Sequence, residues 1–347
     1  MNTVESNISL KPYNTFGIDA EAKYFTEIKS VDDFREVLED KKLAGEKKLI
    51  LGGGSNILLT QNYDGLVIRN CIPGIEVVSE TEHHVIVKAN AGVVWHELVL
   101  WAIERNYGGI ENLSLIPGFC GAAPMQNIGA YGVEIKDVFY ELEAVDVHAG
   151  ALVKFSLTDC EFGYRESVFK GKYKGQFLIT SLSLRFVKLN SAHALAQYRF
   201  RTEYGDIKET LSQMRAYDLS IKAISDAVIK IRSSKLPDPK KIGNAGSFFK
   251  NPVVSKPEYE RLVAIYPVMP SYLQKDGSVK VPAGWLIEQC GWKGKVVGNT
   301  GSHATQALVL VNYGNATGNQ IWQLALDIQQ SVKEKFGIEI SPEVNVV

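Results

Sequence analysis

The chain has 347 residues, of which 45% are hydrophobic and 22% charged, and its formal net charge is −1. This balance is typical of a globular protein with two or three domains. The near-zero charge excludes recruitment of nucleic acid or an anionic membrane by the overall field, so an anionic ligand would need a few local cations.

The sequence shows no targeting segment and no metal motif. The N-terminus lacks an apolar core, which argues against a signal peptide. The most apolar helix candidate, residues 93–103, is short and contains His96 and Glu97, so it does not predict a membrane span. The cysteines are too widely spaced for a disulfide framework or a zinc site: Cys71, Cys120, Cys160 and Cys290. We expect a cytoplasmic monomer that binds no metal, nucleic acid or membrane.

The first half of the chain alternates helices and strands, with glycines where they change. Residues 31–43 space apolar side chains as a surface helix does, and residues 94–109 predict a helix that stops at Gly108 and Gly109. Strands are predicted within 48–51, 65–70 and 83–92, the last with alternating Val85, Val87 and Ala89.

The rest of the chain begins with a long segment, 110–137, that has neither a helix nor a strand pattern. Such a loop inside a compact domain is usually functional. A strand at 176–186 and a polar excursion at 191–207 follow, and then an amphipathic helix at 220–235 and a linker-like stretch at 236–249. Further predictions are helices at 256–266, 283–291 and 319–336, a strand at 307–312, and a terminal strand pattern at 338–347 interrupted by Pro342.

The stretch LGGGSN, Leu51 to Asn56, is a strand running into a glycine turn. Consecutive glycine amides can cradle phosphates. The Rossmann pattern fails because Ile57 occupies its last position, and the P-loop pattern fails because no Lys-Ser/Thr follows. Either this is a pyrophosphate loop of another class, or it is a plain glycine turn.

The stretch IPGFCGAAPMQNIGAYG, within 110–137, is rich in small residues. Small residues let a flat ring lie against the backbone, and the amides of Gln126 and Asn127 could hydrogen-bond to it. The alternative is a long ordered surface loop. Two glycine-rich loops without a metal motif favour a planar nucleotide cofactor such as a flavin.

Several charged or polar residues have both a functional and an ordinary interpretation. Arg165 lies between aromatics, where its planar fork could bind a carboxylate or an enolate, or it could simply cover them at the surface. Ser247, in GNAGSFFKNP, is either a turn residue or a reactive hydroxyl, and we expect Phe248 and Phe249 to anchor that turn in the core. Glu343 follows Pro342, which could fix it in a cleft, although a terminal carboxylate is usually solvated. Lysines and arginines surround Ser247 in sequence, as a phosphorylated ligand would require: Arg232, Lys235, Lys240, Lys241 and Lys250.

Taken together, these stretches resemble the UDP-N-acetylenolpyruvoylglucosamine reductase family of flavoenzymes. The resemblance covers nearly the whole chain, with its motifs in the expected order: NTFGI, LGGGSN, IPGFCGAAPMQNIGAYG, CEFGYRESVFK, KLPDPKKIGNAGSFFKNP, AGWLIEQCGWKG, HATQALVLVN and PEV. RTEYGDI matches the tyrosine-bearing loop of the first of the family's two types. GFCGAAP departs from a more polar version of the flavin loop, which changes the side chains available there.

The resemblance implies an α+β protein of three domains. Two of them form an FAD-binding pair of the vanillyl-alcohol-oxidase-like (PCMH-type) architecture, at 1–72 and 73–236, the second including a tyrosine loop near 190–215. An α+β substrate-binding domain would span 237–336, and residues 337–347 would return to the first FAD part.

The resemblance also implies the chemistry. NADPH would reduce non-covalent FAD, and the hydride would then pass to the enolpyruvyl group of a UDP-sugar in peptidoglycan precursor synthesis. Arg165 would contact the substrate carboxylate, Glu343 would be an acid or orienting partner, and Ser247 would donate the proton to the α-carbon.

The implied ligand-binding residues are as follows. For FAD they are Gly52, Gly53, Gly54, Ser55, Asn56, Ile116, Pro117, Gly118, Gln126, Asn127, Gly129, Ala130, Tyr131, Gly132 and Ile179. For the substrate they are Tyr204, Arg232, Lys235, Asn251 and Gln306, with Tyr204 folded over the diphosphate and Lys235 contacting it.

Two alternatives remain at this point. One is another FAD oxidoreductase on the same scaffold, such as a sugar or alcohol oxidase, for which Cys120 is the only thiol in the flavin loop. The other is a catalytically silent sugar-nucleotide binder, although Arg165, Ser247 and Glu343 are all present.

Overall fold

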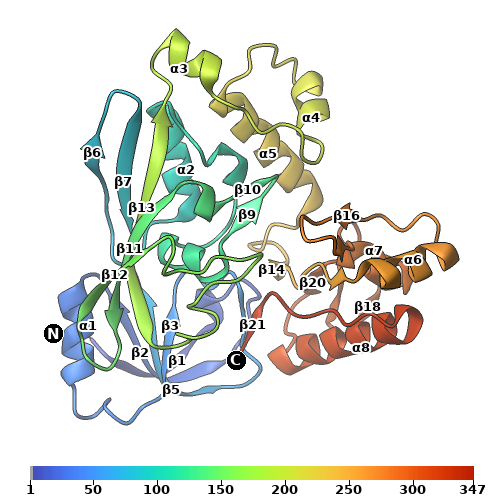
Figure 1. The fold of residues 1–347 in the computed structure, drawn as a ribbon. Coiled ribbons are helices and arrows are strands. Elements are labelled where there is room, and N and C mark those ends of the chain that lie inside the picture. The colour runs from blue at the N-terminus through green and yellow to red at the C-terminus, as the bar shows by residue number, and fades with distance from the viewer. Residues whose placement is uncertain (1–2) are drawn as a thin grey trace. The chain divides into compact units, whose positions relative to one another are not determined.

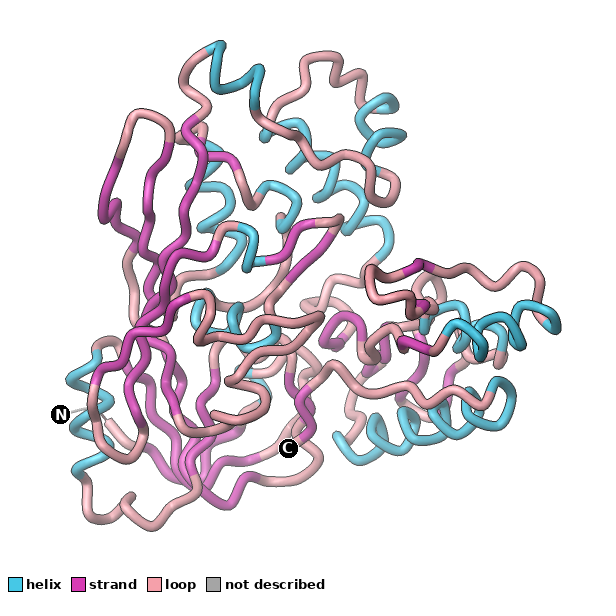
Figure 2. The backbone as a smooth tube through the Cα atoms, in the orientation of Figure 1, coloured by secondary structure: helices cyan, strands magenta, loops and turns pink. Residues whose placement is uncertain are grey.

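The structure is a computed structural model that describes residues 3–347 (Figures 1 and 2). Its backbone contacts divide the chain into two compact units. The first unit comprises the chain up to Ile8, Ala22–Gly53 and Asp64–Ser234, and the second comprises Ser9–Glu21, Gly54–Tyr63 and Lys235–Val347. Helices are combined with mainly antiparallel sheets, which confirms the predicted α+β class. The three-domain boundaries stay a prediction.

One sheet of the first unit has four strands in the order β1-β2-β5-β3, with β3 and β5 parallel. Helix α1 (Val31–Glu39) begins at the capping box of Ser30 and Asp33. It buries Phe34 and Val37 in a cluster with Leu66 of β5. The strands are β1 (Glu5–Ser9), β2 (Glu21–Ile28), β3 (Lys48–Leu51) and β5 (Tyr63–Asn70).

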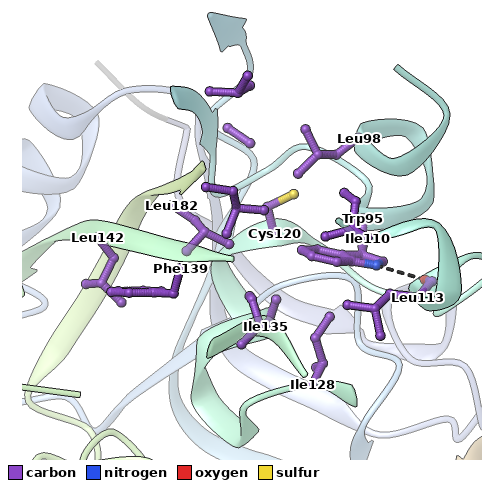
Figure 3. Close-up of a cluster of buried hydrophobic side chains, with 14 of the residues drawn as sticks. Trp95, Leu98, Ile110, Leu113, Cys120, Ile128, Ile135, Phe139, Leu142 and Leu182 are labelled. Carbon is purple, nitrogen blue, oxygen red and sulfur yellow. Dashed lines mark hydrogen bonds between the residues drawn. The ribbon is translucent and has the colours of Figure 1, made fainter. Parts of the chain in front are cut away.

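The other sheet of this unit is antiparallel, in the order β12-β11-β13-β7-β6, with β8 pairing the end of β13. The alternating Val85 and Val87 point into a core that also holds Trp95 and Leu98 of α2 (Trp95–Glu104), part of which is drawn in Figure 3. The strands are β6 (Ile75–Glu80), β7 (His84–Asn90), β8 (Tyr107–Gly108), β11 (Phe139–Asp146), β12 (Leu152–Ser156) and β13 (Phe177–Lys188).

A helical region completes the first unit. It contains α3 (Ala192–Gln197), α4 (Ile207–Gln213) and α5 (Ile221–Lys235). Ile207 of α4 packs in a separate buried cluster with Ile224 and Val228 of α5. The polar excursion predicted at 191–207 therefore includes a short helix and ends at a residue with a buried side chain.

The second unit contains a four-stranded antiparallel sheet, β14-β20-β19-β18, and a three-stranded sheet, β15-β17-β16. Helix α8 (Gly318–Phe336) begins at the cap residue Thr317 and buries the predicted apolar stripe from Ile321 to Phe336. The remaining elements are η1 (Lys11–Tyr13), β4 (Ile57–Leu58), β14 (Gly243–Ser247), β15 (Val253–Val254), α6 (Lys256–Ile265), β16 (Tyr272–Leu273), β17 (Val279–Lys280), α7 (Ala283–Gln289), β18 (Val296–Val297), β19 (Thr300–Ser302), β20 (Val309–Asn312) and β21 (Asn345–Val346).

Two secondary-structure expectations were wrong. Segment 110–137 does contain regular structure: the 3-10 helices η2 (Glu111–Leu113), η3 (Cys120–Gln126) and η4 (Ile135–Asp137), and the strands β9 (Gly129–Ala130) and β10 (Val133–Glu134). Elements this short carry no readable apolar period. The terminal pattern forms a strand only at β21, which pairs with β4, and upstream of it Pro342 makes only an isolated antiparallel bridge with Phe249.

Within residues 3–347, no helix is long and apolar enough to cross a membrane, and no group of three or more metal-binding side chains occurs.

Candidate active site

In the first unit, the start of α2 fixes segment 110–137. The backbone N–H of Trp95 donates to the carbonyl of Gly118 at 2.9 Å, and its indole Nε1–H donates to the carbonyl of Leu113 at 3.0 Å (Figure 3). The N–H of Cys120 donates to Val93, two residues before α2. One stretch therefore determines the path of the predicted flavin-binding residues Ile116, Pro117 and Gly118.

Leu115, at the centre of this path, has a left-handed φ of 58°, which is unusual for a leucine. Its N–H donates to Nδ1 of His96 at 3.0 Å, and its carbonyl accepts from Nε of Arg232 at 3.2 Å. Burial, followed by the charge of Arg232, lowers the pKa of His96, and Glu97 opposes this shift. The neutral imidazole that accepts the Leu115 bond is therefore favoured.

The predicted glycine turn lies against the same loop. A Cβ at Gly53 would lie 3.0 Å from the Cα of Gly118, and one at Gly52 would lie 3.6 Å from Cβ of Ala122. The two glycine-rich stretches thus meet backbone to backbone within the first unit. Backbone presented in this way fits a phosphate-bearing cofactor held by amides rather than by side chains.

Asn127 shapes the loop with its side chain. It is fully buried and left-handed, its amide N–H groups donate to Glu134 and to the carbonyl of Gly163, and its Oδ1 accepts from the N–H of Lys136. Its side-chain amide therefore already has partners within the protein, and its contact with a flavin stays a prediction. Gln126 is partly buried at the end of η3, and Ile179 of β13 is buried with its carbonyl accepting from Asn70.

Strands β9 and β10 form a two-residue hairpin that ends segment 110–137. Ala130 pairs with Val133, so Tyr131 and Gly132 are the turn residues, and both have positive φ. This is the geometry of a type I′ turn. Gly129, Ala130, Tyr131 and Gly132, all predicted to bind the cofactor, therefore belong to one small ribbon.

Arg165 is bound to this ribbon. Its Nη2 donates to the carbonyl of Gly129 at 2.8 Å, and its guanidinium carbon lies 5.8 Å from the ring centre of Tyr164. Ser167, two residues on, donates to the carbonyl of Met125. The predicted carboxylate-binding arginine is thus held beside the predicted flavin loop.

Arg232 of α5 is close to both Tyr131 and Arg165. Burial lowers its pKa, the charge of Tyr131 opposes this, the charge of Arg165 adds to the lowering, and a side-chain hydrogen bond to Tyr131 raises it. Two of the predicted ligand-binding cations, Arg165 and Arg232, are therefore brought together near Tyr131.

Tyr204 also faces the hairpin. A Cβ at Gly132 would lie 3.5 Å from Cβ of Tyr204, and one at Gly205 would lie 3.4 Å from Cδ1 of Tyr131. The turn at Tyr204–Gly205 thus packs on the turn at Tyr131–Gly132. Tyr204 itself remains 52% exposed.

In the second unit, a bulge in β14 orients Ser247. Pairing with β20 shifts register between Asn244 and Ser247, and Gly246 between them has φ +70°. The N–H of Gly246 donates to Oδ1 of Asn244. Bulges of this kind re-aim a side chain. Phe248 and Phe249 are fully buried beyond the bulge, as expected.

Glu343 is brought beside Ser247 within this unit. The N–H of Glu343 donates to the carbonyl of Phe248 at 2.7 Å, and the N–H of Lys250 donates to Ser341. Nδ2 of Asn56 also donates to the carbonyl of Glu343 at 3.4 Å. Three predicted site residues that are far apart in sequence are therefore neighbours: Asn56, Ser247 and Glu343. Two further predicted residues directly precede Asn56 in the sequence. Gly54 has a left-handed φ of +63°, and Ser55 is partly buried.

The remaining substrate-binding candidates of this unit cluster at the start of α7. Oδ1 of Asn251 accepts from the N–H of Ala283 at 2.9 Å, and a Cβ at Gly284 would lie 3.5 Å from Oε1 of Gln306. The carbonyl of Lys235 accepts from the hydroxyl of Thr305, next to Gln306, and Lys235 itself is exposed.

Several residues that build the site had no signal in the sequence. The sequence pattern indicated only that Trp95 and His96 belong to an apolar helix. It placed Glu111 and Tyr198 in irregular segments and gave no sign of their contacts. Cys120, the thiol considered as a flavin anchor, is fully buried, and burial raises its pKa, which makes it a poor nucleophile.

Comparison with known proteins agrees with this geometry. Residues 22–156 match the family described as FAD binding domain, and residues 238–347 match the C-terminal domain of UDP-N-acetylenolpyruvoylglucosamine reductase. The chain is 49% identical over 344 residues to the UDP-N-acetylenolpyruvoylglucosamine reductase of Flavobacterium johnsoniae, covering 99% of both chains. It is 49% identical over 342 residues to that of Pseudomonas putida, covering 99% of this chain and 98% of the relative.

The fold is also similar to a crystal structure of the reductase from Thermus caldophilus. The TM-score is 0.68 with 22% sequence identity, over 100% of this chain and 99% of that one. This likeness supports the fold, while the full-length sequence matches show the family. The chain belongs to the UDP-N-acetylenolpyruvoylglucosamine reductase family.

Proposed function

We propose that this chain reduces the enolpyruvyl group of UDP-N-acetylglucosamine enolpyruvate to give UDP-N-acetylmuramate, in peptidoglycan precursor synthesis. Bound FAD would take hydride from NADPH and supply it to the methylene carbon of the enolpyruvyl group. The observation that carries the proposal is the backbone hydrogen bond from the N–H of Glu343 to the carbonyl of Phe248, which brings the segments of Glu343 and Ser247 side by side within one unit.

The residues of this chain would manage charge and protons. Hydride addition at the methylene carbon leaves negative charge on the α-carbon and its carboxylate, and a cation must oppose that charge. Arg165, held by the carbonyl of Gly129, is the residue proposed for this contact. Its planar fork suits a carboxylate better than the point charge of a lysine would.

Ser247 would then donate its proton to the α-carbon. A serine hydroxyl is a weak acid, so it serves only against a strongly basic carbanion and only when aimed at it. The bulge at Gly246 supports that role, because it sets the direction of the Ser247 side chain. Glu343 would orient the substrate or act as an acid beside it.

The two units would supply different ligand contacts. In the first unit, the backbone contact between Gly53 and Gly118 supports FAD binding by amides, and Tyr204 and Arg232 are the proposed substrate contacts. In the second, Lys235, Asn251 and Gln306 are the proposed substrate contacts, of which Lys235 would meet the diphosphate. We further propose a cytoplasmic monomer of the family's first type, with three domains bounded as expected above.

The test is a spectrum followed by an assay. Purified protein should be yellow, and NADPH should be consumed beyond the one equivalent that reduces the bound flavin only when the enolpyruvyl UDP-sugar is added. A colourless protein that releases no flavin on denaturation would count against the proposal, and oxygen consumption with a simple sugar alcohol would favour an oxidase instead.

A further inference from the structure

A buried carboxyl group links the predicted tyrosine loop to the rest of the first unit. Glu111 of η2 is 3% exposed, and its Oε1 accepts a hydrogen bond of 2.7 Å from the hydroxyl of Tyr198. Its Oε2 accepts one of 2.8 Å from the N–H of Gly109. Both carboxyl oxygens are thus used inside the protein, and neither belongs to the reaction proposed above.

The ring of Tyr198 packs directly against Gly108. A Cβ at Gly108 would lie 2.8 Å from Cζ of Tyr198, so a side chain there would displace the ring. Next to Glu111, Nδ2 of Asn112 donates to the carbonyls of Arg201 and Tyr131, at 2.8 and 3.2 Å. Asn112 is 1% exposed. One buried pair, Glu111 and Asn112, therefore holds both the tyrosine loop and the hairpin turn of segment 110–137.

Tyr204 lies between two anchored points. On its N-terminal side are the contacts of Tyr198 and Arg201, and on its C-terminal side Ile207 is fully buried against α5. Tyr204 itself is half exposed and packs over Gly132. Its position therefore depends on both anchors, and only the Tyr198 anchor consists of a single removable hydroxyl.

We propose that Tyr198 and Glu111 are positioning residues that hold Tyr204 in place for the sugar-nucleotide substrate. They contact neither substrate nor cofactor and act through the backbone between Tyr198 and Tyr204. Burial raises the pKa of Glu111, and the hydrogen bonds from Tyr198 and Gly109 oppose this, so a change at either partner leaves a buried polar group poorly satisfied. The inference rests on the proposed function, because Tyr204 is a substrate contact only under it.

The experiment uses the flavin-loaded enzyme with Tyr198→Phe, which removes one oxygen and keeps the ring. We expect the KM for the enolpyruvyl UDP-sugar to rise about tenfold, as the loss of one buried hydrogen bond would give. The rate of flavin reduction by NADPH alone should stay within about twofold, since the change acts only where the sugar nucleotide binds. Tyr217→Phe, at a side chain that is 86% exposed, is the matched control and should change neither value.

A second readout does not depend on turnover. Trypsin should cut Tyr198→Phe faster after Arg199 and Arg201, both exposed, with cleavage after the exposed Lys240 as an internal reference. Glu111→Gln should behave in the same direction, because an amide cannot accept at both oxygen positions. If wild-type protein does not turn over the substrate, the proposed function fails, and the cleavage result still tests the anchor.

Two outcomes overturn the proposal. In one, Tyr198→Phe retains the wild-type KM and cleavage pattern. In the other, both half-reactions and the melting temperature fall together, which would make the pair a general element of stability and not a positioning device.

Discussion

The imidazole of His96 and the backbone of Leu115 are joined by a hydrogen bond of 3.0 Å, in which Leu115 N–H donates to Nδ1. A protonated imidazole carries hydrogen on both nitrogens and cannot accept this bond. The charged groups that act on His96 are Arg232, which disfavours protonation, and Glu97, which favours it. The strained conformation of Leu115 therefore depends on a neutral His96.

This bond predicts a loss of stability in mild acid. The folded-state pKa of His96 lies below the ordinary value of 6.5, so the unfolded chain takes up the proton first. The contribution is fully present above about pH 6.5 and is lost as the pH falls from there through the folded pKa. Melting temperatures measured across this range should show the decline. His96→Asn keeps an acceptor near Nδ1 and should flatten it, while His83→Asn, at an exposed histidine, should not. A wild-type profile that matches that of His96→Asn would contradict the prediction.

Ser247→Ala should separate the two half-reactions. We expect turnover of the enolpyruvyl substrate to fall about 10²- to 10⁴-fold, the usual contribution of a general acid, while reduction of the flavin by NADPH continues. Stopped-flow measurement of each half-reaction checks this. Ser247→Cys should recover part of the turnover, since a thiol is more acidic than a hydroxyl. If both half-reactions are lost together, Ser247 has a structural role.

Gly53→Ala should weaken FAD binding. The new Cβ would lie 3.0 Å from Cα of Gly118 and 3.3 Å from Cδ1 of Phe119, so the two loops must move apart. Overpacking of this kind costs about 1–3 kcal/mol, which corresponds to roughly 5- to 150-fold in FAD affinity. Flavin fluorescence titration measures the change. Gly45→Ala, where a Cβ meets nothing within 4 Å, is the control, and equal affinities for the two variants would refute the proposed cradle.

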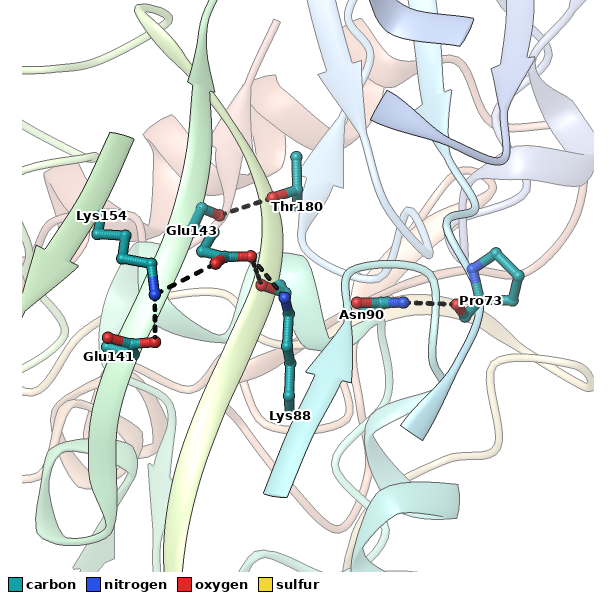
Figure 4. A network of polar contacts seen from close by, with 8 residues as sticks. Pro73, Lys88, Asn90, Glu141, Glu143, Lys154 and Thr180 are labelled. Carbon is teal, nitrogen blue, oxygen red and sulfur yellow. Dashed lines mark hydrogen bonds and ion pairs between the residues drawn. The ribbon is translucent and has the colours of Figure 1, made fainter. Parts of the chain in front are cut away.

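A polar network on the six-stranded sheet predicts a second, independent pH dependence (Figure 4). Burial raises the pKa of Glu143, but the hydrogen bond and charge of Lys88, with smaller help from Ser181 and Lys154, lower it overall. Lys88 and Glu143 are 2.6 Å apart, with side chains 25% and 17% exposed. The stabilisation is present above the unfolded value of 4.5 and is lost as the pH falls through the lower folded pKa.

Glu143→Gln should therefore reduce the free energy of unfolding by about 1–2 kcal/mol at pH 7 and by less at pH 3. Lys154→Met, at a side chain that is 60% exposed, should have a smaller effect at pH 7. Urea unfolding at the two pH values provides the comparison, and a Glu143→Gln effect that does not change with pH would contradict the assignment.

The sequence by itself determined the long elements and the identity of the motifs. The apolar period of α8 and the alternation of β7 were readable because one face of each must be buried. The motif order predicted Ser247, Arg165 and Glu343 as catalytic residues, and the roles proposed for them follow from their residue types.

Only the tertiary structure decided how the loops are held. Hydrogen bonds join Trp95, His96 and Arg232 to residues 113–118, which are distant from them in sequence. Another hydrogen bond joins Tyr198 to Glu111. Their partners are largely backbone carbonyls and N–H groups, which every residue carries and which leave no mark in the side-chain pattern. Short 3-10 turns and positive φ at Leu115 and Tyr131 were hidden for the same reason, because neighbours impose them against local preference.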